Sequence, residues 1–170
     1  MLNKFKKNQF LTAAAVASVL TVAPVCAANI SLPVRPAESP VKNSLVQNTG
    51  ANEYFQQGLN FAAQQNREGA EAAFRRVIQI DPNFAEAYAN LGSILANQNK
   101  LAEALPNFQT AIRLKPNVPE FYYMLAQVLY AQNKVADAVE SVKKARDLFR
   151  NQGKTQEAIT LEQIIKDITK

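Results

Sequence analysis

The chain has 170 residues and a formal net charge of +5, and this length suits one domain with extensions. Three of the basic residues are Lys4, Lys6 and Lys7, so the charge without them is +5 − 3 = +2. Such a weak charge argues against nucleic-acid binding, which favours a basic patch on the folded domain. There is no His, and the one cysteine, Cys26, lies near the N-terminus. Metal sites and catalytic thiols or imidazoles are therefore not expected.

Other catalytic patterns are also missing from the sequence. It has no glycine-rich phosphate loop, and no serine stands in a nucleophile-elbow context. Glu68 and Glu71 are close enough to share a helix face, but they fall in the first turn of a predicted helix, where the helix dipole favours acidic side chains. We therefore expect no enzymatic activity, no cofactor and no metal.

Residues 1–27 have the pattern of a secretory signal peptide. A positive segment is followed by an apolar stretch from Phe10 to Val22, and Pro24 then ends the helix. Ala27 provides the small residue for cleavage, with cleavage after Ala28 as the second choice. We expect a protein outside the cytoplasm, periplasmic or secreted, with no stable membrane insertion once the signal is removed.

Two alternatives for this segment keep the protein at a membrane. An uncleaved signal-anchor helix would run from Phe10 to about Ala28, although Pro24 argues against it. A lipoprotein would carry its lipid on Cys26, although Val25 replaces the small residue usual before such a cysteine. A mitochondrial transit peptide is disfavoured because the segment has no arginine.

Residues 28–50 contain Pro33, Pro36 and Pro40 and show neither a helical period nor strand alternation. This composition predicts a flexible linker between the leader and the domain.

From residue 51 onward, residues of one kind recur every 34 positions, as in Gln64, Gln98 and Gln132. Each unit contains two amphipathic helical stretches joined by a turn. Such a unit cannot bury its apolar side alone, so neighbouring units must stack into a solenoid. We predict three units, at 51–84, 85–118 and 119–152.

The recurring residues resemble those of the tetratricopeptide repeat (TPR) family. The middle unit follows the family pattern most closely, and the third departs from it at several positions. The resemblance implies an all-α, right-handed solenoid of helix-turn-helix units, in which the signature residues serve packing. In this sequence they are Tyr54, Gly58, Ala70, Phe74, Pro82, Tyr88, Gly92, Ala104, Phe108, Pro116, Tyr122, Ala126 and Ala138.

The last residues, 153–170, predict a capping helix. The turn motif recurs at Asn151-Gln-Gly-Lys154, sooner after the third copy than the repeat period would place it, so the last helix of the third unit would also form one arm of a terminal hairpin. Gly153 would end that helix and Thr155 would cap the next. An apolar stripe from Ala158 to Ile168 would cover the end of the solenoid. The alternative is a free helix offered to a partner.

The resemblance also places a partner-binding groove on the concave side, lined by the first helix of each unit. Aromatic side chains there provide rigid contact area, and amides can pair with a peptide backbone. The alternative is that Tyr123 and Tyr130 merely pack beneath the cap. The groove residues are Phe55, Leu59, Asn90, Ser93, Asn97, Tyr123, Met124, Gln127 and Tyr130.

Some family members grip a terminal carboxylate with basic groove residues. Here only Asn90 fits that clamp, because Phe55, Glu120 and Met124 stand where basic residues are needed. We therefore expect a scaffold or assembly adaptor that binds a peptide or protein segment of another kind. The alternative function is a structural subunit of an envelope complex or a homo-oligomer.

Overall fold

The computed structural model describes residues 41–169, with side chains described from residue 50 onward. The signal peptide, Cys26 and the linker up to residue 40 lie outside the described residues. The described chain is α-helical and contains no strand. Its helices are α2 (Val41–Ala63), α3 (Arg67–Ile80), α4 (Ala85–Asn97), α5 (Leu101–Leu114), α6 (Pro119–Ala131), α7 (Val135–Asn151) and α8 (Thr155–Ile168).

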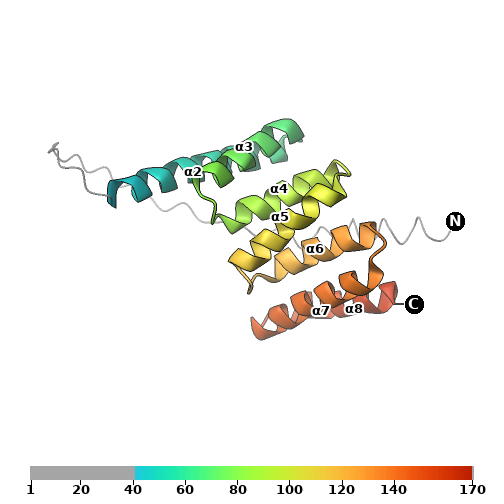
Figure 1. Ribbon diagram of the computed structural model, residues 1–170. Helices are drawn as coiled ribbons and strands as arrows, with labels where there is room; N and C mark the ends of the chain where they lie inside the picture. The colour runs from blue at the N-terminus through green and yellow to red at the C-terminus, as the bar shows by residue number, and fades with distance from the viewer. Residues whose placement is uncertain (1–40, 170) are drawn as a thin grey trace.

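The helices form a row of antiparallel hairpins that runs from α2 and α3 at one end to α7 and α8 at the other (Figure 1). We call α2, α4 and α6 the first helices and α3, α5 and α7 the second helices. The predicted all-α repeat solenoid is confirmed.

Each hairpin turn contains one residue in the left-handed backbone region, at Gln65, Asn99 and Asn133. Asparagine, present at two of these positions, tolerates this conformation because its short polar side chain can hydrogen-bond locally. The residue after each of them donates its backbone N–H across the turn, as Lys100 does to the Leu95 carbonyl at 2.9 Å. The sequence period therefore fixes a repeated backbone geometry as well as a repeated composition.

The two helices of a unit approach closely where the sequence has small residues. A methyl group at Gly58 would lie 2.6 Å from the ring of Phe74, and one at Gly92 would lie 3.0 Å from Phe108. Ala104 on the opposing second helix is fully buried. Glycine and alanine at these crossings let the aromatic rings fill the space between the backbones.

The first helix begins earlier than the sequence analysis predicted. Val41–Ala63 is one continuous helix, so the linker prediction is wrong for residues 41–50. Pro40 stands just before the helix, and no proline follows until Pro82, so nothing interrupts the hydrogen-bond ladder. Ala51 is fully buried and joins Val77 and Ala87 in one core cluster, which anchors the middle of α2 to the solenoid.

The C-terminal hairpin repeats the geometry of the turns within units. Gly153 has φ of +74°, and Lys154 donates its N–H to the Phe149 carbonyl at 2.9 Å. α8 then packs through Ala158, Leu161 and Ile165. The structure differs from the sequence analysis at the helix start: Thr155 is the first residue of α8, and Lys154 holds the cap position without a side-chain hydrogen bond.

Candidate functional site

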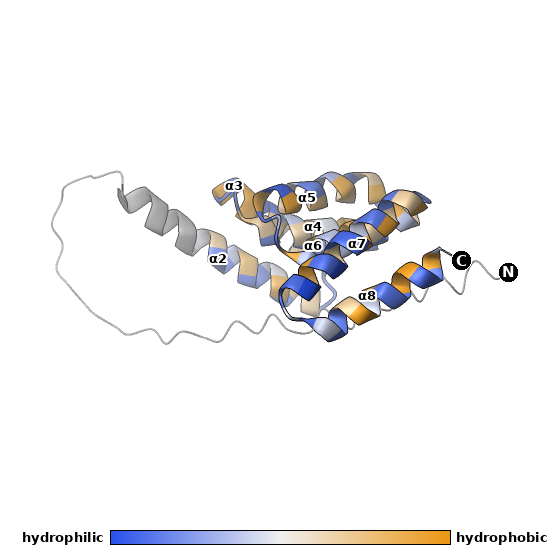
Figure 2. Ribbon diagram, turned by 90° about the horizontal axis from the view of Figure 1, so that it is seen from below, coloured by the Kyte–Doolittle hydropathy of each residue, from blue (hydrophilic) through white to orange (hydrophobic). Residues whose placement is uncertain are grey.

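The predicted groove residues all lie on the first helices α2, α4 and α6, which Figure 2 shows with α4 and α6 between α2 and α8. The structure divides these residues into two sets. Six of them form a candidate binding surface. Tyr123 and Tyr130 pack on the core cluster shared by α6, α7 and α8, and Gln127 hydrogen-bonds with Tyr123. We call the first set the first-helix face: Phe55, Leu59, Asn90, Ser93, Asn97 and Met124.

α2 contributes the apolar end of the first-helix face. The ring of Phe55 is half-buried and lies 5.7 Å from Phe74 and 4.8 Å from Phe84, measured between ring centroids. These contacts link α2 to α3 and to the start of α4, so Phe55 serves packing as well as the surface. Leu59 is 36% exposed, which makes it one of the most exposed large apolar side chains of the described residues.

α4 contributes the polar centre. The Asn90 amide donates through Nδ2 to the Glu86 carbonyl at 2.8 Å, and the Ser93 hydroxyl donates to the Ala89 carbonyl at 3.0 Å. Both side chains therefore use a hydrogen-bond donor within α4. Asn97 is exposed at the end of α4.

Met124 connects the polar centre to α6. Its Sδ lies 3.8 Å from the Ser93 Oγ, and the side chain is half-buried against the cores of the second and third units. A flexible thioether at this position supplies an apolar contact that can adjust to different neighbours.

The remaining three predicted residues belong to a different environment. Tyr123 and Tyr130 pack against the cluster that includes Leu161 and Ile165 of α8. Burial raises the pKa of Tyr123, and a hydrogen bond with the half-buried Gln127 opposes that change. Both tyrosines are only partly buried, so their place in the binding groove stays a prediction beside the alternative of packing beneath the cap.

Two ion pairs flank the first helices, and the sequence analysis did not predict them. Glu86 in the first turn of α4 pairs with Lys115 at 2.5 Å, and Glu120 in the first turn of α6 pairs with Lys154 at 3.7 Å. A signal was available, because Glu86, Glu120 and Lys154 share one register of the repeat. Lys154, at the N-cap of α8, thus pairs with Glu120 in the first turn of α6.

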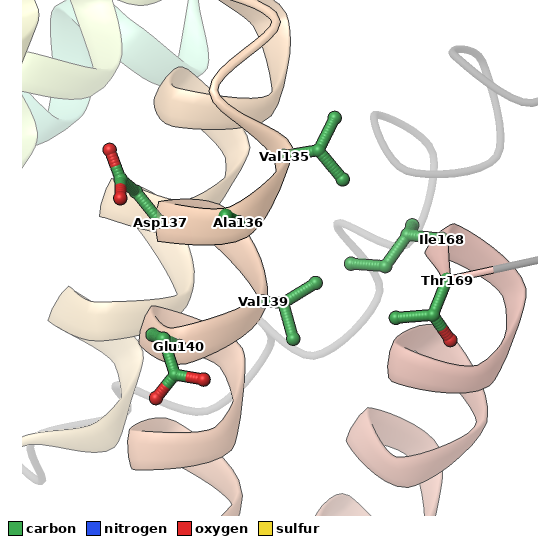
Figure 3. Close-up of a pocket in the computed structure, with 7 residues that line it drawn as sticks. All are labelled: Val135, Ala136, Asp137, Val139, Glu140, Ile168 and Thr169. Carbon is green, nitrogen blue, oxygen red and sulfur yellow. The ribbon is translucent and has the colours of Figure 1, made fainter.

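A separate hollow of about 610 Å³ opens between the first turns of α7 and the end of α8. Val135, Val139, Ile168 and Thr169 point toward one another across it, whereas Asp137 and Glu140 point away (Figure 3). α7 has 17 residues and α8 has 14, so α8 ends before it has covered the start of its partner. None of the residues that line the hollow belongs to the first-helix face.

Two negative findings apply to the described residues. None of their helices is long and apolar enough to cross a membrane. No group of three or more cysteine or acidic side chains is arranged there to hold a metal ion.

Comparisons with known proteins identify the repeats. Family models match residues 54–83 and 73–105, both as a tetratricopeptide repeat, and residues 92–133 as a TPR repeat. The chain belongs to the tetratricopeptide repeat family. Among curated proteins, none matches the sequence of this TPR protein.

Several solved structures resemble this TPR chain. The TPR2B domain of yeast Sti1, in complex with pHsp70, has a TM-score of 0.67 at 23% identity, over 71% of this chain and 97% of that one. The Yersinia enterocolitica secretion chaperone SycD, in complex with a peptide of the translocator YopD, has a TM-score of 0.65 at 17% identity, over 69% and 91%.

An enzyme is also among the similar structures. An O-GlcNAc transferase mutant from Thermobaculum terrenum has a TM-score of 0.58 at 24% identity, over 60% of this chain but only 20% of that one. At these identities the likeness shows the fold alone, and the small share of the transferase that is matched gives no reason to assign catalysis to this chain.

Proposed function

We propose that this TPR protein is a non-catalytic scaffold or assembly adaptor that holds a segment of another protein on its first-helix face. The observation that carries the proposal is the composition of that face. Leu59 on α2 and Met124 on α6 offer apolar contact area, and Asn90 lies on α4, the first helix between them, where its amide can pair with a peptide backbone. The Sti1 and SycD structures support it, because they are complexes with pHsp70 and with a YopD peptide.

We further propose that the protein acts outside the cytoplasm of a bacterium. The support is the sequence of residues 1–27, with its positive segment, apolar stretch and small residues before Ala28. The intact mass of the exported protein tests this, since it should correspond to a chain that begins at Ala28 or Asn29. A full-length mass in the membrane fraction would indicate a signal anchor, and a lipid adduct on Cys26 would indicate a lipoprotein.

The binding proposal has a matched pair of variants. Asn90 on α4 and Asn107 on α5 both donate Nδ2 to a backbone carbonyl one helical turn earlier at 2.8 Å, but only Asn90 lies on the first-helix face. Alanine at either position removes the same local bond. Asn90→Ala should weaken capture of a partner from an envelope fraction by about tenfold, or ~1.4 kcal/mol, and Asn107→Ala should not. Equal capture by both folded variants would contradict the proposal.

A structural subunit is the second candidate function, and the C-terminal hairpin favours it. Ile159 on the outer side of α8 is 56% exposed, and Val135 beside the hollow is 37% exposed. Apolar surface of this kind can mark a permanent interface if it is contiguous. Light scattering with size-exclusion chromatography decides between the two: an adaptor should be monomeric, and a homo-oligomeric subunit should elute as a multimer.

A further inference from the structure

The described side chains of the first helices carry no positive charge. Residues 50–63 of α2, all of α4 and all of α6 contain no lysine or arginine. Lys115 and Lys154 lie next to α4 and α6, but each already forms an ion pair, with Glu86 and with Glu120 respectively. A ligand carboxylate placed over this surface would lose hydration without gaining a cationic partner, which is unfavourable.

The orientation of the Asn90 amide also disfavours an anionic ligand. The Glu86 carbonyl can only accept, so the nitrogen of the amide must face it, and Oδ1 lies on the other side. The Ser93 hydroxyl likewise donates its proton to the Ala89 carbonyl, so its oxygen lone pairs can accept a hydrogen bond from a ligand. The centre of the face therefore offers acceptors, which match the backbone N–H groups of an extended peptide better than they match an anion.

Apolar side chains lie on the two first helices on either side of α4. Leu59 is exposed on α2, and Met124 is half-buried on α6 at 3.8 Å from Ser93. An extended segment that crosses from α2 to α6 would place apolar side chains over both of them while its backbone passes Asn90.

From these observations we infer that the first-helix face takes an internal, uncharged and apolar segment of a partner polypeptide and rejects an acidic or C-terminal carboxylate-bearing one. This inference rests on the proposed function, because it names the chemistry of the ligand for the same surface.

The test uses a displayed library of random peptides, selected on the purified protein. The selected peptides should be rich in aliphatic and aromatic residues and poor in Asp and Glu. Their affinity should change by less than about twofold between about 0.05 M and about 0.5 M NaCl, since screening has little effect without a charge pair. Amidation of the C-terminus should leave the affinity unchanged.

Lysine at the two matched asparagines gives the decisive contrast. Asn90→Lys should weaken the selected peptides by about tenfold and begin to retain acidic peptides, whereas Asn107→Lys should do neither. Leu59→Lys on the exposed part of α2 provides a second variant if Asn90→Lys fails to fold.

The outcomes separate the inference from the proposed function. Selection of acidic peptides whose binding depends on Asn90 or Leu59 would overturn the inference and leave the binding face in place. Peptides that bind equally to the Asn90, Leu59 and Asn107 variants, or no selected peptides at all, would overturn both.

Discussion

At one register position, the boundary between the first and second units holds a charged side chain, whereas the boundary between the second and third units holds an apolar one. Glu71 of α3 occupies the position that Leu105 occupies one repeat later on α5. The Glu71 side chain is only 11% exposed, pairs with Arg75, lies 4.0 Å from Lys100 and accepts a 2.9 Å hydrogen bond from Gln98.

Leu105 makes apolar contacts at the equivalent place. It packs against the core cluster of the second unit and also against that of the third. The next turn still carries Gln132 and Lys134, the counterparts of Gln98 and Lys100, but no acid meets them at this position. The repeat thus preserves the backbone geometry of the boundary while its chemistry changes from a charge network to hydrophobic contact.

The third boundary, between α7 and α8, uses Val139 at the same position and is incomplete. Val139 is buried, but the hollow beside it remains open at the end of α8. The same register position therefore holds Glu71 in a charge network, Leu105 in a packed apolar contact and Val139 beside a partly covered surface. Mutations at the three boundaries should therefore have different effects on stability.

Removal of α8 should have the largest effect. Truncation after Gly153 strips Leu161 and Ile165 from the core and exposes Phe149. Burial of a large aliphatic side chain is worth ~1.5–3 kcal/mol, so we expect a loss of several kcal/mol or aggregation. Urea unfolding and light scattering measure this. A truncated protein that stays monomeric and unfolds at the full-length midpoint would show that α8 is a free arm.

Truncation of Leu105 should come next. Leu105→Ala leaves a void between two core clusters, and we expect a loss of about 2 kcal/mol, the lower end for such changes, because the side chain is half-buried. Leu59→Ala removes the same atoms from an exposed site and should cost about 0.5 kcal/mol or less. Equal urea midpoints for the two variants would contradict the assignment of Leu105 to the boundary.

The Glu71 network should make the boundary between the first and second units the most sensitive to acid. Burial alone would raise the pKa of Glu71, but the hydrogen bond from Gln98 and the charges of Arg75 and Lys100 outweigh it and lower the pKa. A lowered folded-state pKa contributes stability that is present above the unfolded value, about 4.3, and is lost as the pH falls through the folded value.

Glu71→Gln isolates this contribution. At neutral pH we expect it to cost about 1–2 kcal/mol, and at a pH below the folded pKa the difference from the unmodified protein should vanish, because Glu71 is then also uncharged. Glu68→Gln changes an exposed acid of the same helix and serves as the control. A Glu71→Gln deficit that is the same at both pH values would show that the network does not act through charge.

The repeats could be predicted because each helix crossing requires small and aromatic residues at fixed positions, and these requirements produce the regular period in the sequence. Gly58 and Phe74 meet for this reason. The start of α2 could not be predicted, since residues 41–50 lack the apolar period on which the analysis depended, and helix continuity there follows from the absence of proline.

The candidate site was predictable in part for a similar reason. Helical register brought Ser93 and Met124 together, as the 3.8 Å contact between their side chains shows. Register could not reveal that Tyr123 and Tyr130 would pack on a core cluster that includes α8 residues, because the position of α8 depends on the length of α7 and on the turn at Gly153, which lie outside the regular repeat.

A photo-activated cross-linking residue placed at Leu59 or at Ile159 tests the central claim most directly. Both side chains are exposed and apolar, at 36% and 56%, but Leu59 belongs to the first-helix face and Ile159 to the outer side of α8. If the protein is an adaptor that uses the first-helix face, irradiation should join a partner polypeptide to the Leu59 position and leave the Ile159 position unlinked. Cross-linking at Ile159 alone would contradict this account and favour a structural subunit that docks through its C-terminal hairpin.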